Sequence, residues 1–335
     1  MRFLKPIQVA FAAAAVALEA GCFSARTQAP VPFARQSHTR GVIFRAGYHG
    51  AEYNKCPATG LLVYVSDQAD GTVNIFAGHL AGQAPCGILT GFNTGEDLMV
   101  SSGNLYATKG PPSPDVRAYH RGGMSPFKTY VDTTCGDEAP GDVTVSDDGY
   151  VVASNILGRT CSSGSISLWK RSSGALVANY QNANGQAIYS LTIQKDGTLY
   201  YSDGTPGLWV GKCVAGACTS FTNTGADFGF PGGVRSVKSE HVVLIDQREH
   251  DLLTYTPPSF GTPSGTCTIA GVEPVGMDLN KKETRLFVAD SVLGVAKEFK
   301  YPAGGGNGQA CTLVGTVTTS GGLPVGVAVD PPESL

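Results

Sequence analysis

Residues 274–299 read PVGMDLNKKETRLFVADSVLGVAKEF and form the clearest copy of a cassette that recurs along the chain. Val275–Leu279 alternates small and apolar residues, Arg285–Ala289 is a β-branched and aromatic run that ends at Asp290, and Gly294–Phe299 closes on an aromatic. Runs of this kind between turn residues predict three short β-strands. Because the cassette returns about every 45 residues, the sequence predicts a β-propeller.

The turn before the second strand of each cassette marks six copies. The turns lie 43 to 48 residues apart, at Gly60, Gly103, Gly149, Gly197, His241 and Arg285. The predicted third strands each carry one large aromatic residue: Phe76, Tyr119, Trp169, Trp209, Tyr255 and Phe299. One aromatic in every repeat predicts packing between neighbouring blades.

The two ends of the repeat array complement each other. The predicted first strands are Leu98–Val100, Val143–Val145, Leu191–Ile193, Val234–Val237, Met277–Leu279 and Val327–Val329. The last of these has no second strand after it, and the second strand Leu61–Ser66 has no clear first strand before it. We therefore expect the C-terminal strand to complete the first blade and to close a six-bladed propeller of four-stranded blades. Gly41–Tyr48 is a competing extra strand.

Composition excludes some classes of protein. The chain has 335 residues, 42% hydrophobic and 15% charged, with 44 glycines and a net charge of −3 from mixed acids and bases. Such a balance has no electrostatic footprint for nucleic acid. No stretch after the first residues is long and apolar enough for a membrane span. We expect a monomer.

The N-terminus predicts export. Arg2 and Lys5 precede the apolar run Val9–Leu18, which is typical of a signal peptide over residues 1–21. We expect a flexible tether over residues 22–40, the propeller over residues 41–335, and an extracytoplasmic location.

The type of signal stays open between a lipoprotein and a plain secreted product. Ala20-Gly21-Cys22 resembles the end of a bacterial lipobox, with Cys22 as the lipidated residue, but Glu19 stands where that pattern wants an aliphatic residue. Lipidation of Cys22, or cleavage beyond it near Ala25, leaves eight of the nine cysteines.

An even number of cysteines in an exported chain predicts disulfides. Cys213 and Cys218 flank a plausible hairpin turn, and Cys135 with Cys161 would link the entry of the third blade to its own loop. The remaining four have three pairings, which the sequence leaves open: Cys56, Cys86, Cys267 and Cys311.

The loops that enter the innermost strands are expected to meet at the mouth of the central channel. Aligning the copies places Asp97, Asp142 and Ser190 at equivalent positions there, with glycines in the other three and Glu96 beside Asp97. These oxygens predict a ligand-binding mouth. They also suit a hard cation such as Ca²⁺, or a carboxyl pair in which one pKa is raised. The alternative is that the acids are solvated turn residues.

Two further patterns have plain interpretations. An Asp or Asn ends five of the six second strands (Asp67, Asn155, Asp203, Asp246 and Asp290), and such regularity predicts bonds to loop amides. Nucleophile motifs such as GxSxG and HExxH are absent, and the Ser-x-x-Lys spacing in Ser125–Lys128 and Ser165–Lys170 has no supporting motif.

The stretches PVGMDLN, RLFVADS, VAKEF and PVGVAVD resemble NHL repeats and the SMP-30/gluconolactonase-like group of six-bladed propellers. For the lactonase members this resemblance implies a divalent metal at the channel mouth, and Asp290 matches the strand-end Asp ligand by position. Val275 stands where those members have an Asn ligand. NHL-type members resemble binding platforms.

The first hypothesis for function is therefore an exported, non-catalytic propeller that binds a protein or small-molecule ligand through its loop face. The alternative is a metal-dependent hydrolase of lactones or esters built on Asp97, Asp142 and Asp290. A purely structural envelope protein is the third hypothesis, because the fold alone does not choose among them.

Overall fold

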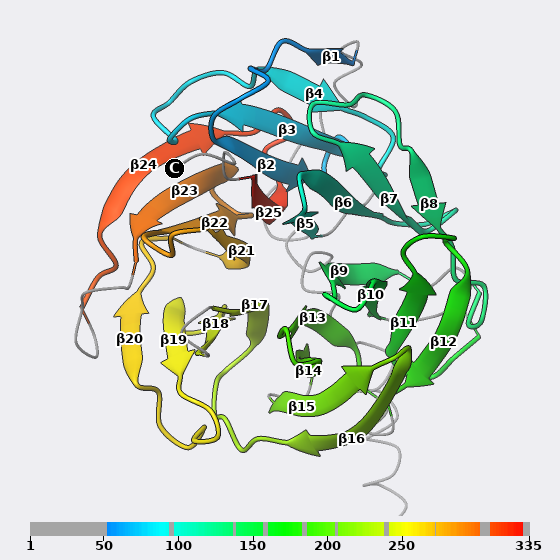
Figure 1. Ribbon diagram of the computed structural model, residues 1–335. Coiled ribbons are helices and arrows are strands. Elements are labelled where there is room, and N and C mark those ends of the chain that lie inside the picture. The colour runs from blue at the N-terminus through cyan, green and yellow to red at the C-terminus, as the bar shows by residue number, and fades with distance from the viewer. Residues whose placement is uncertain are drawn as a thin grey trace, which may run out of the picture. The chain divides into compact units, whose positions relative to one another are not determined.

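The computed structural model describes residues 52–93, 97–136, 139–156, 160–182, 186–204, 207–237, 241–271, 273–301 and 309–330. The expected signal peptide and tether, Cys22, Glu96 and the competing strand Gly41–Tyr48 lie outside the described residues. Residues 46–335 belong to one compact unit. Within it the described strands form six antiparallel sheets arranged as the blades of a ring (Figure 1).

The first three blades have these strands, in order from the innermost strand outward. Blade 1 has β25 (Pro324–Asp330), β2 (Leu62–Asp67), β3 (Thr72–Ala77), β4 (Gly87–Leu89) and β1 (Tyr53–Asn54). Blade 2 has β5 (Leu98–Ser101), β6 (Asn104–Lys109), β7 (Asp115–His120) and β8 (Lys128–Tyr130). Blade 3 has β9 (Pro140–Val145), β10 (Tyr150–Asn155), β11 (Ser165–Lys170) and β12 (Leu176–Gln181).

The other three blades follow the same pattern. Blade 4 has β13 (Ile188–Ile193), β14 (Thr198–Asp203), β15 (Gly207–Val214) and β16 (Ala217–Asn223). Blade 5 has β17 (Pro231–Ser236), β18 (Val242–Asp246), β19 (Asp251–Tyr255) and β20 (Gly265–Thr268). Blade 6 has β21 (Pro274–Leu279), β22 (Arg285–Asp290), β23 (Val295–Lys300) and β24 (Leu313–Thr318).

The C-terminal strand closes the ring, as the sequence predicts. β25 pairs antiparallel with β2, so that Val327 lies opposite Val65 and Val329 lies opposite Val63. The inner strands of neighbouring blades contact one another all round the ring, including β25 with β5 and with β21. The short strand β1, which pairs with β4, gives blade 1 a fifth strand. Two residues are too few to produce a period-2 signal, so the sequence did not predict it.

In blades 2, 3 and 4 a glycine with positive φ lies in the turn between the first and second strands: Gly103, Gly149 and Gly197. Gly197, in the turn between β13 and β14, has a φ of +85°, a backbone conformation that L side chains rarely adopt. A Cβ at this position would also come within 2.4 Å of the carbonyl oxygen of Cys213. The turn therefore requires glycine for its conformation and for its close contact.

The aromatic ladder packs between blades, which confirms the sequence prediction. Phe76 of blade 1, for example, shares a hydrophobic cluster with Phe287 of blade 6, and Trp169 of blade 3 shares one with Tyr106 of blade 2. The other four aromatics of the ladder contact the preceding blade in the same way, Tyr119, Trp209, Tyr255 and Phe299. The core of the ring is thus the series of interfaces between sheets.

Four disulfides are formed in the described residues. The expected pairs Cys213–Cys218 and Cys135–Cys161 are among them, and the four cysteines left open pair as Cys56–Cys86 and Cys267–Cys311. Cys267 lies on β20 of blade 5, whereas Cys311 precedes β24 of blade 6, so this bond links neighbouring blades. Four disulfides indicate an oxidising environment. No helix within the described ranges is long and apolar enough to span a membrane.

Candidate functional site

The channel residues predicted from the sequence converge around an arginine. Asp142, whose side chain is fully buried, accepts hydrogen bonds from the hydroxyl of Ser190 at 2.5 Å and from Arg235 Nη1 at 2.8 Å. Asp97, only 5% exposed, accepts a hydrogen bond from Arg235 Nη2 at 3.2 Å. The acids therefore do not line an open mouth; they are buried against a guanidinium.

Arg235 spans the ring to make these contacts. It lies on β17 of blade 5, and blade 2 with Asp97 stands opposite blade 5 in the ring (Figure 1). Its Nη2 also lies 3.3 Å from the carbonyl oxygen of Leu98, and its Nε lies 3.9 Å from the carboxylate of Asp278 on the adjacent blade. The Arg235 side chain thus links its own strand β17 to β9, to β21 and to the start of β5.

The same carboxylates hold backbone amides of two blades at once. Asp142 accepts from the amide of Val143 on its own strand at 2.7 Å and from that of Leu191 on β13 at 3.1 Å. Ser190 continues the series, because its oxygen accepts from the amide of Val234 on β17 at 2.9 Å. Each polar side chain therefore bonds an inner strand to the next one round the ring.

Asp97 and Asp278 serve the closing strand. Asp97 Oδ1 accepts from its neighbour Leu98 at 2.8 Å and from the amide of Val327 on β25 at 3.2 Å. Asp278 accepts from the amide of Val329 at 2.8 Å. The strand that completes blade 1 is held by a carboxylate from each neighbouring blade.

Glycine at the aligned positions permits this close approach. A Cβ on Gly276 would lie 2.3 Å from the carbonyl oxygen of Val325 and 3.2 Å from Asp97 Oδ1. A Cβ on Gly233 would lie 2.9 Å from the amide nitrogen of Met277. These glycines bring the inner strands together rather than leaving an open space for a ligand.

Electrostatics follow from placing three acids beside one base. Burial, reinforced by the charge of Asp142, raises the pKa of Asp97 well above its ordinary value. Burial also raises the pKa of Asp278 to about 6, although Arg235 opposes the shift. Burial alone would lower the pKa of Arg235, but the charges of Asp142, Asp97 and Asp278 outweigh it and raise that pKa. The guanidinium therefore stays charged.

The predicted metal ligands Asp97, Asp142 and Asp290 form hydrogen bonds with other groups of the protein. Asp290, the third expected ligand, lies on β22 and binds Lys297 Nζ at 2.8 Å and the amide of Leu293 at 3.2 Å. No group of three or more His, Cys, Asp or Glu side chains placed to hold a metal ion occurs in the described part of the chain. In the channel, the position between Asp97 and Asp142 is taken by the donors of Arg235.

The strand-end acids bind loop amides, as their regularity predicts. Asp246 accepts from the amides of Gly229 at 2.5 Å and Phe230 at 3.1 Å, which lie in the connection that enters its own blade. Asp67 accepts in the same way from Gly321 and Leu323, before β25. These acids fix the loops that lead into the innermost strands.

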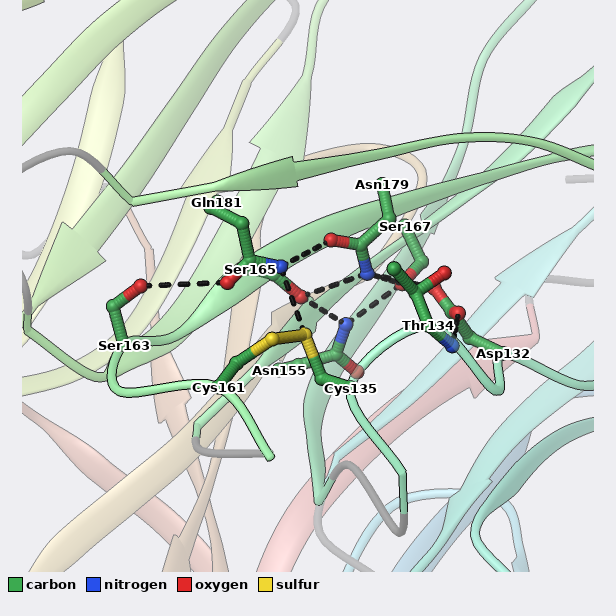
Figure 2. The surroundings of a disulfide bond; sticks show 10 residues. All are labelled: Asp132, Thr134, Cys135, Asn155, Cys161, Ser163, Ser165, Ser167, Asn179 and Gln181. Atoms are coloured by element: carbon green, nitrogen blue, oxygen red, sulfur yellow. Dashed lines mark hydrogen bonds between the residues drawn. A yellow bond between two sulfur atoms is a disulfide. The ribbon is translucent and has the colours of Figure 1, made fainter. Parts of the chain in front are cut away.

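Asn155 differs, because its amide bonds side chains. In blade 3 the Asn155 amide donates to Ser165 and Ser167, and Ser167 and Asn179 donate to Asp132 in the entry loop (Figure 2). Burial alone would raise the pKa of Asp132, but the hydrogen bonds that its carboxylate accepts outweigh burial, so the pKa lies below its ordinary value. The adjacent Cys135–Cys161 disulfide holds the same loop, as Figure 2 shows. In blade 4, Asp203 accepts from Asn182 at 2.8 Å.

Sequence reasoning missed Arg235 and Asp278. Both lie inside segments that the sequence predicts as innermost strands, Val234–Val237 and Met277–Leu279. A charged residue in a strand that is buried on both faces is rare unless it is paired. That signal was available in the sequence, but it could not identify the partners of Arg235. Asp142 lies 93 residues and Asp97 lies 138 residues away from Arg235 in the chain.

Comparison with known proteins shows the fold. No family model matches the chain, and neither does any curated protein sequence. A nidogen/laminin complex contains a chain that is 13% identical with a TM-score of 0.60, and the match covers 81% of this chain and 98% of that one. A functionally unknown protein from Desulfotomaculum acetoxidans is 13% identical with a TM-score of 0.54, covering 81% and 99%.

A luciferin-regenerating enzyme is also similar. It is 11% identical with a TM-score of 0.54, and the match covers 69% of this chain and 80% of that one. At such low identities these likenesses extend to the propeller fold and not to activity.

Proposed function

We propose that the chain is an exported propeller that binds a ligand or a protein partner through its surface and performs no chemistry in its channel. The observation that carries this proposal is the Arg235 side chain, which occupies the carboxylates of Asp97 and Asp142 from across the ring. A metal-dependent hydrolase needs those oxygens for a cation. Here they bind a guanidinium and backbone amides instead.

Other features agree with a binding protein of the cell exterior. The four disulfides suit an oxidising compartment, and the signal-like N-terminus supplies a route of export. We assign the chain to the NHL-like and SMP-30-like propellers on its repeat motif, and to the binding rather than the lactonase type because Val275 replaces the Asn ligand. A chain of a nidogen/laminin complex shares the fold, and we infer a comparable use of the surface in this protein.

Metal analysis of the purified protein, combined with a lactone and aryl-ester screen with and without chelator, tests the absence of chemistry. We expect no stoichiometric divalent metal and no turnover that a chelator abolishes. One bound metal per chain together with chelator-sensitive hydrolysis would overturn the proposal in favour of the hydrolase.

Fractionation of cells that express the full chain tests export. The protein should be found outside the cytoplasm, and Cys22→Ala separates the two forms of the signal. Release of the variant from the membrane fraction indicates a lipid anchor at Cys22, and an unchanged soluble distribution indicates plain secretion. Retention of the wild-type chain in the cytoplasm would contradict export.

A further inference from the structure

A pocket of about 480 Å³ lies between blades 2 and 3, away from the channel cluster. Its walls come from β6, β7 and β8 of blade 2 and, in blade 3, from the turn between β9 and β10 and from the end of β11 with the turn after it. This volume lies in the range of small-molecule sites. Of its lining residues only Phe127 and Gly149 lack a polar side-chain group, and the aromatic rings add apolar surface beside these polar groups.

The lining of the pocket is positive overall, with Lys128, Lys170 and Arg171 against the carboxylate of Asp148. Lys170 and Arg171 both line it, and neither forms an ion pair with a described residue. Asp148, the acid in the lining, already accepts from the hydroxyl of Ser146 at 2.5 Å and from the amide of Ala215 at 2.9 Å. These neutral donors orient the Asp148 carboxylate but leave its charge, so an anion that enters the pocket meets three cations and one carboxylate, a net positive charge.

Hydrogen bonds from both blades hold the backbone of the turn that carries Lys170 and Arg171. The amide of Arg171 donates to the carbonyl of Gly149 at 2.9 Å, and its own carbonyl accepts from the hydroxyl of Tyr130 at 3.2 Å. Lys128 donates to the carbonyl of Ser172 in the same turn. The backbone of the turn that presents Lys170 and Arg171 is thus tied to both blades, which limits the ordering that a ligand must impose on it.

An aromatic platform and a free hydroxyl complete the lining. The ring of Phe127, 42% exposed, stacks on His120 with centroids 4.2 Å apart and an interplanar angle of 12°. Tyr106 is only 1% exposed, and its hydroxyl has no hydrogen-bond partner among the described residues. Because Tyr106 lines the pocket, a ligand there can reach its hydroxyl.

We propose that this pocket binds an acidic sugar, a pyranose ring that carries a carboxylate. Arg171 and Lys170 hold the carboxylate, the ring packs on the exposed face of Phe127, and Tyr106 bonds a sugar hydroxyl. The inference rests on the proposed function, because it names a ligand class for a chain that binds rather than reacts.

The polar lining favours a sugar over an aromatic acid. A flat apolar ring would fill the pocket but would cover the Tyr106 hydroxyl and the cationic groups of Lys170 and Arg171 without bonding them, which costs free energy for each covered group. A polyhydroxylated ring satisfies them and still offers C–H groups to Phe127. The carboxylate supplies the charge that two unpaired cations require, with Arg171 capable of a bidentate contact.

The pocket also accounts for two lysines that the sequence placed in Ser-x-x-Lys spacing. Lys128 and Lys170 end the segments Ser125–Lys128 and Ser165–Lys170, and both line this pocket. Ser167, the serine three residues before Lys170, is fully buried and donates to Asp132 instead. The spacing therefore places cations in a binding site and does not build a nucleophile there.

Isothermal titration of the full chain tests the site with trisaccharides of galacturonic, mannuronic and glucuronic acid, and with neutral galactotriose. At least one acid should bind, and at least about tenfold more tightly than galactotriose, because a charge-assisted pair of hydrogen bonds is lost with the carboxylate. The double variant Lys170→Ala, Arg171→Ala should weaken that binding by at least about tenfold. Phe127→Ala should weaken it several-fold.

The matched control is Lys195→Ala with Arg248→Ala, which removes the same charge from exposed positions outside the pocket. It should bind as the wild type does, and circular dichroism should show all variants folded. The inference is overturned if none of the three acids binds, if galactotriose binds equally well, if the double variant keeps wild-type affinity, or if Phe127→Ala has no effect.

The two proposals fail separately. A chain that carries no metal, turns over no lactone or ester, and ignores all three acids refutes the sugar site and leaves the non-catalytic binding function standing. Chelator-sensitive turnover refutes the proposed function whatever the sugars do.

Discussion

Arg235 donates a hydrogen bond to Asp97 on the opposite side of the propeller, with 3.2 Å between Nη2 and Oδ2. The two residues are 138 positions apart in the chain and belong to blades 5 and 2. This contact across the ring places a charged guanidinium at the centre of the channel, where it pairs with acids of three other blades. It also explains why the acids in the channel are buried rather than exposed to solvent.

Arg235→Met should strongly destabilise the protein. The substitution keeps an unbranched side chain but leaves Asp97, Asp142 and Asp278 without their counter-ion in a buried site. Breaking a buried pair by removing one partner costs about 3–5 kcal/mol of unfolding free energy. Urea denaturation measures this loss, and Arg248→Met, at an exposed position, is the control. A loss similar to that of the control would show that the cluster contributes little.

Stability should depend on the protonation of Asp278. Its pKa is about 6 in the folded protein against 3.8 ordinarily, so the folded state binds the proton more tightly than the unfolded state. The free energy of unfolding that this group contributes is therefore full below about pH 4 and falls as the pH rises to about 6.

The wild type and Asp278→Asn, compared by urea denaturation across this range, isolate the effect. The difference in unfolding free energy, wild type minus variant, should decrease from about pH 4 to about pH 6 and then level off. A difference that rises with pH, or that stays constant, would contradict the raised pKa.

The disulfide between blades 5 and 6 should contribute more stability than the one within a hairpin. Cys267–Cys311 joins residues 44 positions apart, whereas Cys213–Cys218 joins residues 5 apart. Loop-closure entropy predicts about 4 kcal/mol for the first and about 2 kcal/mol for the second. Paired Cys→Ser variants compared by thermal unfolding measure the order. An equal or reversed order would show that strain or residual structure outweighs chain entropy.

Val327→Asp should prevent the ring from closing. Val327 is fully buried on β25, pairs with Val65 of β2, and gives its amide to Asp97. An unpaired charge buried there should cost about 4 kcal/mol or more. The control is Val314→Asp on the outer strand β24, where Val314 is 41% exposed. Circular dichroism and size-exclusion chromatography should show a folded control and an unfolded or aggregated Val327→Asp; two similarly folded proteins would contradict the role of β25.

Much of the architecture was predictable because it depends on local patterns. The second strands, the turn glycines and the aromatics of the third strands depend on residues within one cassette, and the pairing of Val327–Val329 with the first blade follows from counting strands. The strand-end acids Asp67, Asp246 and Asp290 do bind loop amides, as predicted. The bonded amides of Asp246 and Asp290 are close in sequence, whereas Asp67 bonds the amide of Gly321, 254 positions away, because the C-terminal strand returns to its blade.

The site was predictable only in part. Aligning the repeats placed Asp97, Asp142 and Ser190 at equivalent positions, and the structure brings Asp142 and Ser190 within 2.5 Å of each other. The alignment treats the blades as equal, however, and Arg235 and Asp278 are departures from the repeat. Residues that differ between blades decide what the centre of the ring contains.

By itself the sequence determined that six sheet-forming modules exist, in what order they follow, and that the last strand belongs to the first sheet, because hydrophobic periodicity and turn chemistry act over a few residues. Only the tertiary structure decided that the channel acids bind Arg235, that blades 5 and 6 share a disulfide, and that Lys128, Lys170 and Arg171 line one pocket. Those outcomes depend on which side chains come into contact when the ring closes. Such contacts join residues that are far apart in the sequence, so local patterns do not predict them.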